Sequence, residues 1–259
     1  MTARNAAVAG LFYPAEAATL ERAVTRLLAA APAGDESAKA IIAPHAGYQY
    51  SGQTAAHAYR LLEHRSEQIR RVVLLGPAHR VYLQGMALPS VDTFTTPLGD
   101  VPIDAAGVKQ ALALPGTQIS DEAHADEHSL EVHLPFLQTV LGDFRLVPVV
   151  VGVCAPQAVE TLLVALWGGD ETLIVVSSDL SHYHTYAAAQ EADARTTERI
   201  RARETTLQGD EACGAYALNG LMLAARERGL KVRTLDLRNS GDTAGDRSRV
   251  VGYGAYALA

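Results

Sequence analysis

The sequence predicts an α/β fold: a single-domain layered sandwich with a mixed, largely parallel central sheet flanked by helices. Short runs of β-branched residues alternate with longer amphipathic runs along the chain, which is the pattern of strands alternating with helices. No repeat, low-complexity segment or long linker interrupts the 259 residues. We therefore expect one domain that covers residues 1–259.

In the first part of the chain, the periodicity predicts a helix over residues 16–30 and a turn rich in Pro and Gly at 31–35. Strands are expected at 40–43 and 71–75, with a helix at 53–62 between them. This order predicts a β-turn-α-β unit. Parallel strands joined in this way place their carboxyl ends at one edge of the sheet.

The remainder of the chain continues the alternation. The stretch 85–103 contains short strand-like pieces and turn residues, which indicates an antiparallel edge or hairpin. Further strands are predicted at 145–151, 172–177, 232–236 and 250–258, and helices at 156–167, 187–203 and 214–228.

Composition and charge exclude several classes of protein. The net charge of −7 disfavours nucleic acid as a partner, because such binding needs clustered Lys and Arg. No apolar run approaches the roughly 18 residues of a transmembrane helix, so we expect no membrane partner. The apolar stretch near the start is cut short by Pro14 and Glu16, and the two cysteines form no C-x-x-C pair. A reducing, cytoplasmic location fits these features.

Histidines follow three of the predicted strands. His45 comes after strand 40–43, His79 after strand 71–75, and Asp179 and His182 after strand 172–177. Imidazole binds Zn, Cu, Fe and Ni, and two such ligands leave room for a third protein group and for substrate. The alternative is that each histidine is a loop residue hydrogen-bonded to nearby backbone.

Residues 121–133 form the densest cluster of groups that can bind a metal. His128 and His133 are five positions apart, about 140° on a helix, so the cluster does not match H-E-x-x-H and a regular helix cannot present both to one ion. A helix start at Ser129 would place Glu127 and His128 at its entrance, facing the site. We expect Glu127, His128 and His133 to face the substrate or to hold the metal ligands in place. The alternative is that this stretch is a solvated acidic loop.

Two further features bear on the chemistry. Pro135 lies deep enough in the helix expected after Ser129 to kink it. Cys213 stands at a probable helix start, where a thiolate is favoured, although a lone cysteine is more often a small buried hydrophobe. The sequence has no G-x-S-x-G, Walker A or G-x-G-x-x-G fingerprint opening a helix, which argues against a nucleotide cofactor.

Several long motifs, in this order, resemble the Memo family, known from bacteria, archaea and eukaryotic cell-motility signalling. The resemblance covers nearly the whole chain; the signalling role belongs to the eukaryotic members. The motifs are Gly10-Leu11-Phe12-Tyr13-Pro14, Pro44-His45-Ala46-Gly47-Tyr48-Gln49-Tyr50-Ser51-Gly52, Gly76-Pro77-Ala78-His79, Glu127-His128-Ser129-Leu130-Glu131-Val132-His133-Leu134-Pro135-Phe136, Ser177-Ser178-Asp179-Leu180-Ser181-His182-Tyr183, and Gly241-Asp242 to Gly252-Tyr253.

The resemblance implies a fold like that of LigB-type class III extradiol dioxygenases, which cleave catechol rings with non-haem Fe(II). In that comparison His45 and His79 take the positions of the two metal-binding histidines. His182 takes the position of the acid/base histidine, with Asp179 beside it. The third ligand departs from the dioxygenase pattern, because the Memo pattern offers a cysteine, here Cys213. A thiolate favours copper or a different iron chemistry, so ordinary catechol cleavage is not expected.

The resulting functional hypothesis is a metal-dependent oxidoreductase that acts on a small molecule, with one Fe(II) or Cu ion. Tyr48, Tyr50 and Tyr183 lie beside the proposed ligands in the sequence and are candidates to line its pocket. The main alternative is a non-catalytic metal-binding or redox protein that works through a partner. A zinc hydrolase is the last alternative. In prokaryotes the family name is attached to a radical-SAM and AMMECR1-type protein set, which the resemblance implies as partners.

Overall fold

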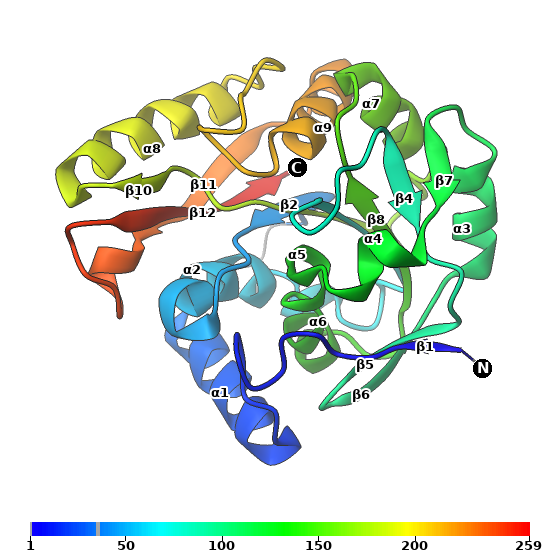
Figure 1. Ribbon diagram of the computed structural model, residues 1–259, viewed down its shortest axis with the longest axis horizontal. Coiled ribbons are helices and arrows are strands. Elements are labelled where there is room, and N and C mark those ends of the chain that lie inside the picture. The colour runs from blue at the N-terminus through cyan, green and yellow to red at the C-terminus, as the bar shows by residue number, and fades with distance from the viewer. Residues whose placement is uncertain (1, 35–36) are drawn as a thin grey trace.

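The predicted α/β class is confirmed: a mixed sheet crosses the protein with helices on both of its faces (Figure 1). The computed structural model describes residues 2–34 and 37–259. Its large sheet has the strand order β10-β12-β2-β9-β3-β8-β4-β7, with β11 paired to β12. A separate three-stranded sheet is formed by β1 (Ala3–Arg4), β5 (Thr93–Thr96) and β6 (Gly99–Pro102).

The centre of the large sheet is parallel. It consists of β2 (Ala40–Ala43), β9 (Thr172–Ser177), β3 (Arg71–Pro77) and β8 (Arg145–Val151). These strands are almost continuous runs of Val, Ile, Leu and Ala because helices cover both of their faces. Burial of these side chains on both faces stabilises the sheet and holds the four carboxyl ends at one edge.

The flanks of the sheet add antiparallel pairs and, at one edge, a further parallel pair. On one side β12 (Val250–Leu258) pairs with β2, and both β11 (Val232–Asn239) and β10 (His182–His184) pair with β12. On the other side β4 (Met86–Leu88) pairs antiparallel with β8 and parallel with β7 (Thr117–Ile119). The pairing of β10 with β12 carries the segment after β9 back across the sheet edge.

Helices form the outer layers (Figure 1). One layer contains α7, α8 and α9, and the other contains α1, α2, α5 (His128–Glu131) and α6 (Leu134–Val140). In the part of the chain that the structure describes, no helix is both long and apolar enough to span a membrane. The bounds are α1 (Ala17–Ala30), α2 (Tyr48–Arg60), α7 (Pro156–Ala165), α8 (Tyr186–Arg201) and α9 (Ala215–Glu227).

The expected elements are present, with differences at their ends. Helix α2 starts at Tyr48 rather than at residue 53, because the ring of Tyr48 packs against Tyr13 and Phe136 and its N–H donates to the carbonyl of Phe12. The predicted hairpin in 85–103 is formed by β5 and β6. Part of the predicted turn 31–35 lies outside the described residues, since these omit Asp35.

The segment between β6 and β8 is more helical than the sequence pattern indicated. It contains α3 (Ala105–Leu112), α4 (Asp121–Ala125), α5 (His128–Glu131) and α6 (Leu134–Val140). The prediction that Pro135 kinks a helix was wrong. Pro135 lies in the first turn of α6, where a missing N–H costs nothing, so the chain forms two short helices instead of one bent helix.

Candidate metal centre and its cavity

Three strand ends converge at the carboxyl edge of the sheet. His45 follows β2, Asp179 follows β9 and His79 follows β3, and these three strands are neighbours. Residue Ala43 pairs with Ser177, so the two chains leave the sheet together. The backbone N–H of His45 then donates to Asp179 Oδ1 at 2.8 Å. Adjacent parallel strands thus bring residues far apart in the sequence to one site.

The rings of His45, His79 and His128 face one another. Each offers a nitrogen, and these nitrogens all lie within 4.8 Å of one another. The ring centroids are 5.1 Å apart for His45 and His79, 5.4 Å for His45 and His128, and 4.7 Å for His79 and His128. Three imidazoles at this spacing are a donor set that suits Zn, Cu or Fe.

A hydrogen-bond chain fixes the tautomer of His45. The hydroxyl of Ser177 donates to the carbonyl of Ser129 at 2.6 Å, so its proton is already used. Ser177 Oγ must therefore accept from Nδ1 of His45, which lies 2.6 Å away. Nδ1 carries the proton and Nε2 carries the free lone pair. Burial lowers the pKa of His45 well below its usual value, which keeps that lone pair available.

His79 is held in the same way by Glu127. One carboxylate oxygen accepts the backbone N–H of His79 at 2.6 Å, and the other lies 3.0 Å from its Nδ1. Burial opposes ionisation of Glu127, but hydrogen bonds from His79 and Ser129 outweigh it and lower the pKa to about 2. An ionised carboxylate only accepts hydrogen bonds, so Nδ1 of His79 carries the proton and Nε2 is free.

His128 reaches the group because α5 packs directly on β3. A Cβ on Gly76 would lie 2.7 Å from Ser129 Oγ, so only glycine allows this approach. The Nδ1 atom of His128 is 3.3 Å from Glu127 Oε1 but is buried without a hydrogen-bond partner. Burial lowers its pKa to about 4, and the Phe12 ring lies 4.8 Å away. A buried imidazole with an unsatisfied nitrogen is consistent with a ligand role.

Cys213 contacts His45 from the start of α9. Its Sγ lies 3.5 Å from Nε2 of His45, the nitrogen with the free lone pair, and accepts the N–H of Asp179 at 3.2 Å. Burial and the neighbouring Asp179 charge raise the pKa of the thiol well above its usual value. A bound cation would reverse that effect and favour the thiolate. The sulfur contacts His45 and is not part of the three-histidine group.

Asp179 is buried and contacts His45. Burial raises the pKa of its carboxyl to about 7, although the N–H groups of His45 and Ala46 act in the opposite direction. Its Oδ2 is 4.0 Å from Nε2 of His45. The raised pKa stabilises the acid form of this carboxyl, so Asp179 can hold a proton beside His45.

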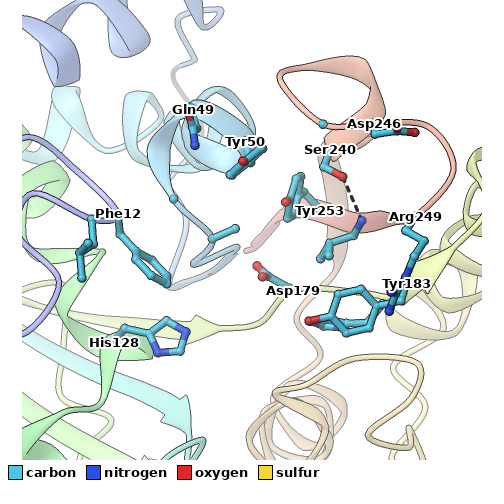
Figure 2. A pocket seen from close by; sticks show the side chains of 16 residues that line it. Phe12, Gln49, Tyr50, His128, Asp179, Tyr183, Ser240, Asp246, Arg249 and Tyr253 are labelled. Carbon is cyan, nitrogen blue, oxygen red and sulfur yellow. Dashed lines mark hydrogen bonds between the residues drawn. The ribbon is translucent and has the colours of Figure 1, made fainter.

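A cavity of about 450 Å³ opens beside this cluster. Figure 2 shows Phe12 and His128 on one side of it, Tyr183 and Arg249 on the other, and Asp179 between them. His182, half-buried at the start of β10, also lines the space, and burial lowers its pKa. The other lining residues are Leu11, Ala46, Gly47, Gln49, Tyr50, Ser240, Gly245, Asp246, Val251 and Tyr253.

Two of the expected site residues lie away from the cavity. Tyr48 is buried, and its hydroxyl donates to the carbonyl of Val132 at 2.8 Å. His133 has no exposed surface, and its Nδ1 is hydrogen-bonded to Tyr59 at 2.7 Å. Burial lowers the pKa of His133 to about 3, which keeps it neutral. Both side chains pack beneath the site and support the helices that carry it.

Sequence reasoning missed three contributors. Ser177 stands in a recognised motif but received no role, because only the structure shows its hydroxyl between Ser129 and His45. Phe12 contacts the ring of His128 from a turn near the N-terminus. Arg249 reaches the cavity from the segment before β12, where the sequence pattern gives no signal beyond a nearby strand end.

Known proteins match this chain over nearly its whole length. The family described as Memo-like protein matches residues 4–257. A MEMO1 family protein of Aquifex aeolicus is 36% identical and covers 98% of both chains, and one of Methanosarcina acetivorans is 36% identical and covers 100% of both. An uncharacterized protein of Escherichia coli K12 has a similar fold, with a TM-score of 0.53, 14% identity, and coverage of 83% of this chain and 98% of that one.

Proposed function

The chain belongs to the Memo-like protein family, and from that premise we propose that it holds one transition metal ion, iron or copper, on His45 and His79. The observation that carries the proposal is the pair of hydrogen bonds that orients these rings. Ser177 Oγ accepts a hydrogen bond from Nδ1–H of His45, and Glu127 accepts one from Nδ1–H of His79. Both Nε2 lone pairs are then free for a metal, and outer partners of this kind are typical of ligand histidines.

Two groups compete for the third position. His128 is favoured by its place in the three-histidine group, and Cys213 by its contact with Nε2 of His45. A thiolate favours copper or an unusual iron site, whereas a third imidazole suits zinc as well. Cobalt(II) distinguishes them, since thiolate ligation gives a sulfur-to-cobalt charge-transfer band. Loss of this band in Cys213→Ser assigns the position to sulfur; its absence from the parent, with weaker binding in His128→Gln, assigns it to His128.

For the function we propose oxidation of a small molecule. The bound ion would supply the redox chemistry. The cavity of about 450 Å³ is of the size that encloses such a substrate. His182, neutral at pH 7 because burial lowers its pKa, accepts a proton from the substrate. Asp179, with a pKa of about 7, holds or releases a proton at the cavity floor.

The test is anaerobic reconstitution with Fe(II), Cu(I) and Zn(II). We expect the parent to bind one ion tightly and the double variant His45→Ala, His79→Ala to lose that ion. The matched control is His64→Ala, His184→Ala, which removes two exposed histidines outside the group. Equal binding by the parent and the His45/His79 variant would sink the proposal.

Turnover then separates an enzyme from a metal-handling protein. An oxidoreductase consumes oxygen and substrate in proportion to the product formed, whereas a binder only changes metal speciation. A protein that works through partners would instead be retained by radical-SAM or AMMECR1-type proteins from the same cell. Metal binding without oxygen consumption across a substrate screen would favour this second function.

A further inference from the structure

The cavity has an unpaired cation at its rim. Arg249 is exposed and lines the cavity, and its guanidinium lies 4.9 Å from the centre of the Tyr183 ring. Within residues 2–34 and 37–259 it has no carboxylate partner and no hydrogen bond. By contrast, Arg247 on the same segment donates to the carbonyl of Gly241 and stacks on Tyr186. A free guanidinium over an aromatic face is ready to receive a planar anion.

The backbone of Tyr183 is adapted to this arrangement. Its φ of 62° lies in the left-handed region, which is unfavourable for a bulky residue. The ring is also 64% exposed, although burial would stabilise it. Outliers of this kind cluster at ligand sites, where the surrounding structure maintains them. Here the left-handed conformation accompanies the placement of the ring at the cavity rim beneath Arg249 (Figure 2).

We propose that the cavity binds a small aromatic monocarboxylate. Its carboxylate would pair with Arg249, and its ring would pack among Phe12, Tyr50 and Tyr183. The far end would then point past Asp179 toward His128, which lies on the opposite side of the cavity from Arg249 (Figure 2). The inference rests on the proposed function, since it names the substrate class of that same site.

The carboxylates around the cavity disfavour a ligand with more than one negative charge. Asp246 lines the same end of the cavity as Arg249, and Asp179 lies at the floor. The carboxylate of Asp246 accepts the N–H of Ser248 at 2.6 Å, which lowers its pKa and keeps it ionised. Because these carboxylates already add negative charge to the cavity, a dianionic phosphate would meet stronger repulsion than a monocarboxylate would. The planar fork of arginine also matches a carboxylate in two-point pairing.

The experiment measures binding of benzoate, 4-hydroxybenzoate and benzamide by calorimetry and saturation-transfer NMR, on metal-free and Zn(II)-loaded protein. Zinc is redox-inert, so no turnover interferes. We expect the two carboxylates to bind the parent and to weaken by about tenfold or more in Arg249→Gln. Arg249→Lys should bind the carboxylates with an affinity between those of the parent and Arg249→Gln, because it keeps the charge but loses the two-point hydrogen bonding of the guanidinium. Arg247→Gln is the matched control and should bind like the parent.

Benzamide has the same shape without the charge. Weak benzamide binding that does not depend on Arg249 supports the inference. Carboxylates that bind the parent and Arg249→Gln equally, benzamide that binds as well as benzoate, or no binding of any probe to the Zn(II)-loaded parent overturns it. The metal proposal has a separate readout, since reconstitution of the His45→Ala, His79→Ala variant tests it without a carboxylate. Failure of either proposal can therefore be recognised while the other stands.

Discussion

Glu127 binds His79 at two points, with one oxygen 2.6 Å from the backbone N–H and the other 3.0 Å from Nδ1 of the ring. The same carboxylate accepts the N–H of Ser129 at the start of α5. One buried residue therefore orients a ligand candidate and connects it to the short helix that carries His128. Because Glu127 is ionised, the proton on Nδ1 of His79 is defined by its partner.

The first prediction concerns this carboxylate. In Glu127→Gln the amide keeps one acceptor oxygen and replaces the other with an NH2 donor. One of the two contacts to His79 therefore becomes repulsive. We expect metal affinity to fall by about 10- to 100-fold, as for other partners of ligand histidines. Competition with a chromophoric chelator measures the change. The exposed Glu122→Gln is the control, and equal affinities for both variants would contradict the role of Glu127.

Ser177 gives a second prediction. Ser177→Ala removes the acceptor that holds the proton on Nδ1 of His45 and leaves the carbonyl of Ser129 without its donor. We expect a stability loss of about 1–3 kcal/mol together with weaker metal binding. Thr197→Val is the matched control, since it removes a buried hydroxyl that is hydrogen-bonded to Tyr256 instead. Urea unfolding and chelator competition separate the two effects; a Ser177→Ala protein with unchanged metal affinity would contradict the tautomer argument.

The fold could be predicted because periodicity reports burial directly. Strands buried on both faces, such as β2 and β9, are continuous apolar runs, and α1 shows its apolar stripe. The rule that chemistry gathers after parallel strands selected His45, His79 and Asp179 before any coordinates. The order of β2, β9 and β3 in the sheet is enough to bring these three side chains together.

The rest of the site depends on packing that the pattern does not encode. His128 joins the histidine group because Gly76 lets α5 approach β3, which is a contact between distant segments. The five-residue spacing of His128 and His133 predicted that one regular helix could not present both to the same ion. In the structure these two residues do not share a helix, because the segment forms α5 and α6. Arg249 and Phe12 reach the cavity from loops, whose course is set by tertiary contacts.

The third prediction concerns acid stability. Burial lowers the pKa of His124 to about 4, against about 6.5 in an unfolded chain. The unfolded state therefore binds a proton first as pH falls below about 6.5, and stability is lost progressively toward pH 4. Between pH 7.5 and pH 5 this residue should account for about 2 kcal/mol of that loss. His124→Gln should reduce the difference in unfolding free energy between these pH values by that amount.

Urea unfolding at both pH values checks this, with the exposed His64→Gln as control. The control should keep the pH dependence of the parent, because its substitution leaves the buried His124 unchanged. His124 lies outside the three-histidine group, so the measurement does not depend on metal content. A His124→Gln protein that loses as much stability as the parent at pH 5 would contradict the assignment.

The fourth prediction concerns the buried pair of Arg4 and Glu131. Glu131 has no exposed surface and accepts from Arg4, from Tyr13 at 2.5 Å, and from the N–H groups of Ala7 at 2.8 Å and Val8 at 3.0 Å. This one carboxylate fastens the N-terminal segment that carries Phe12 over His128. Glu131→Gln leaves the guanidinium buried without its counter-charge, which should cost about 3–5 kcal/mol.

A double-mutant cycle with Arg4→Met identifies the source of that loss. The double variant should be less destabilised than the sum of the single variants, because it buries no unpaired charge. The exposed pair of Arg201 and Glu198 is the control, and its disruption should cost no more than about 1 kcal/mol. Amide hydrogen exchange around Phe12 should accelerate in Glu131→Gln. Strictly additive losses with unchanged exchange would mean that the N-terminal segment is held by apolar packing, and that Glu131 does not position the wall of the cavity.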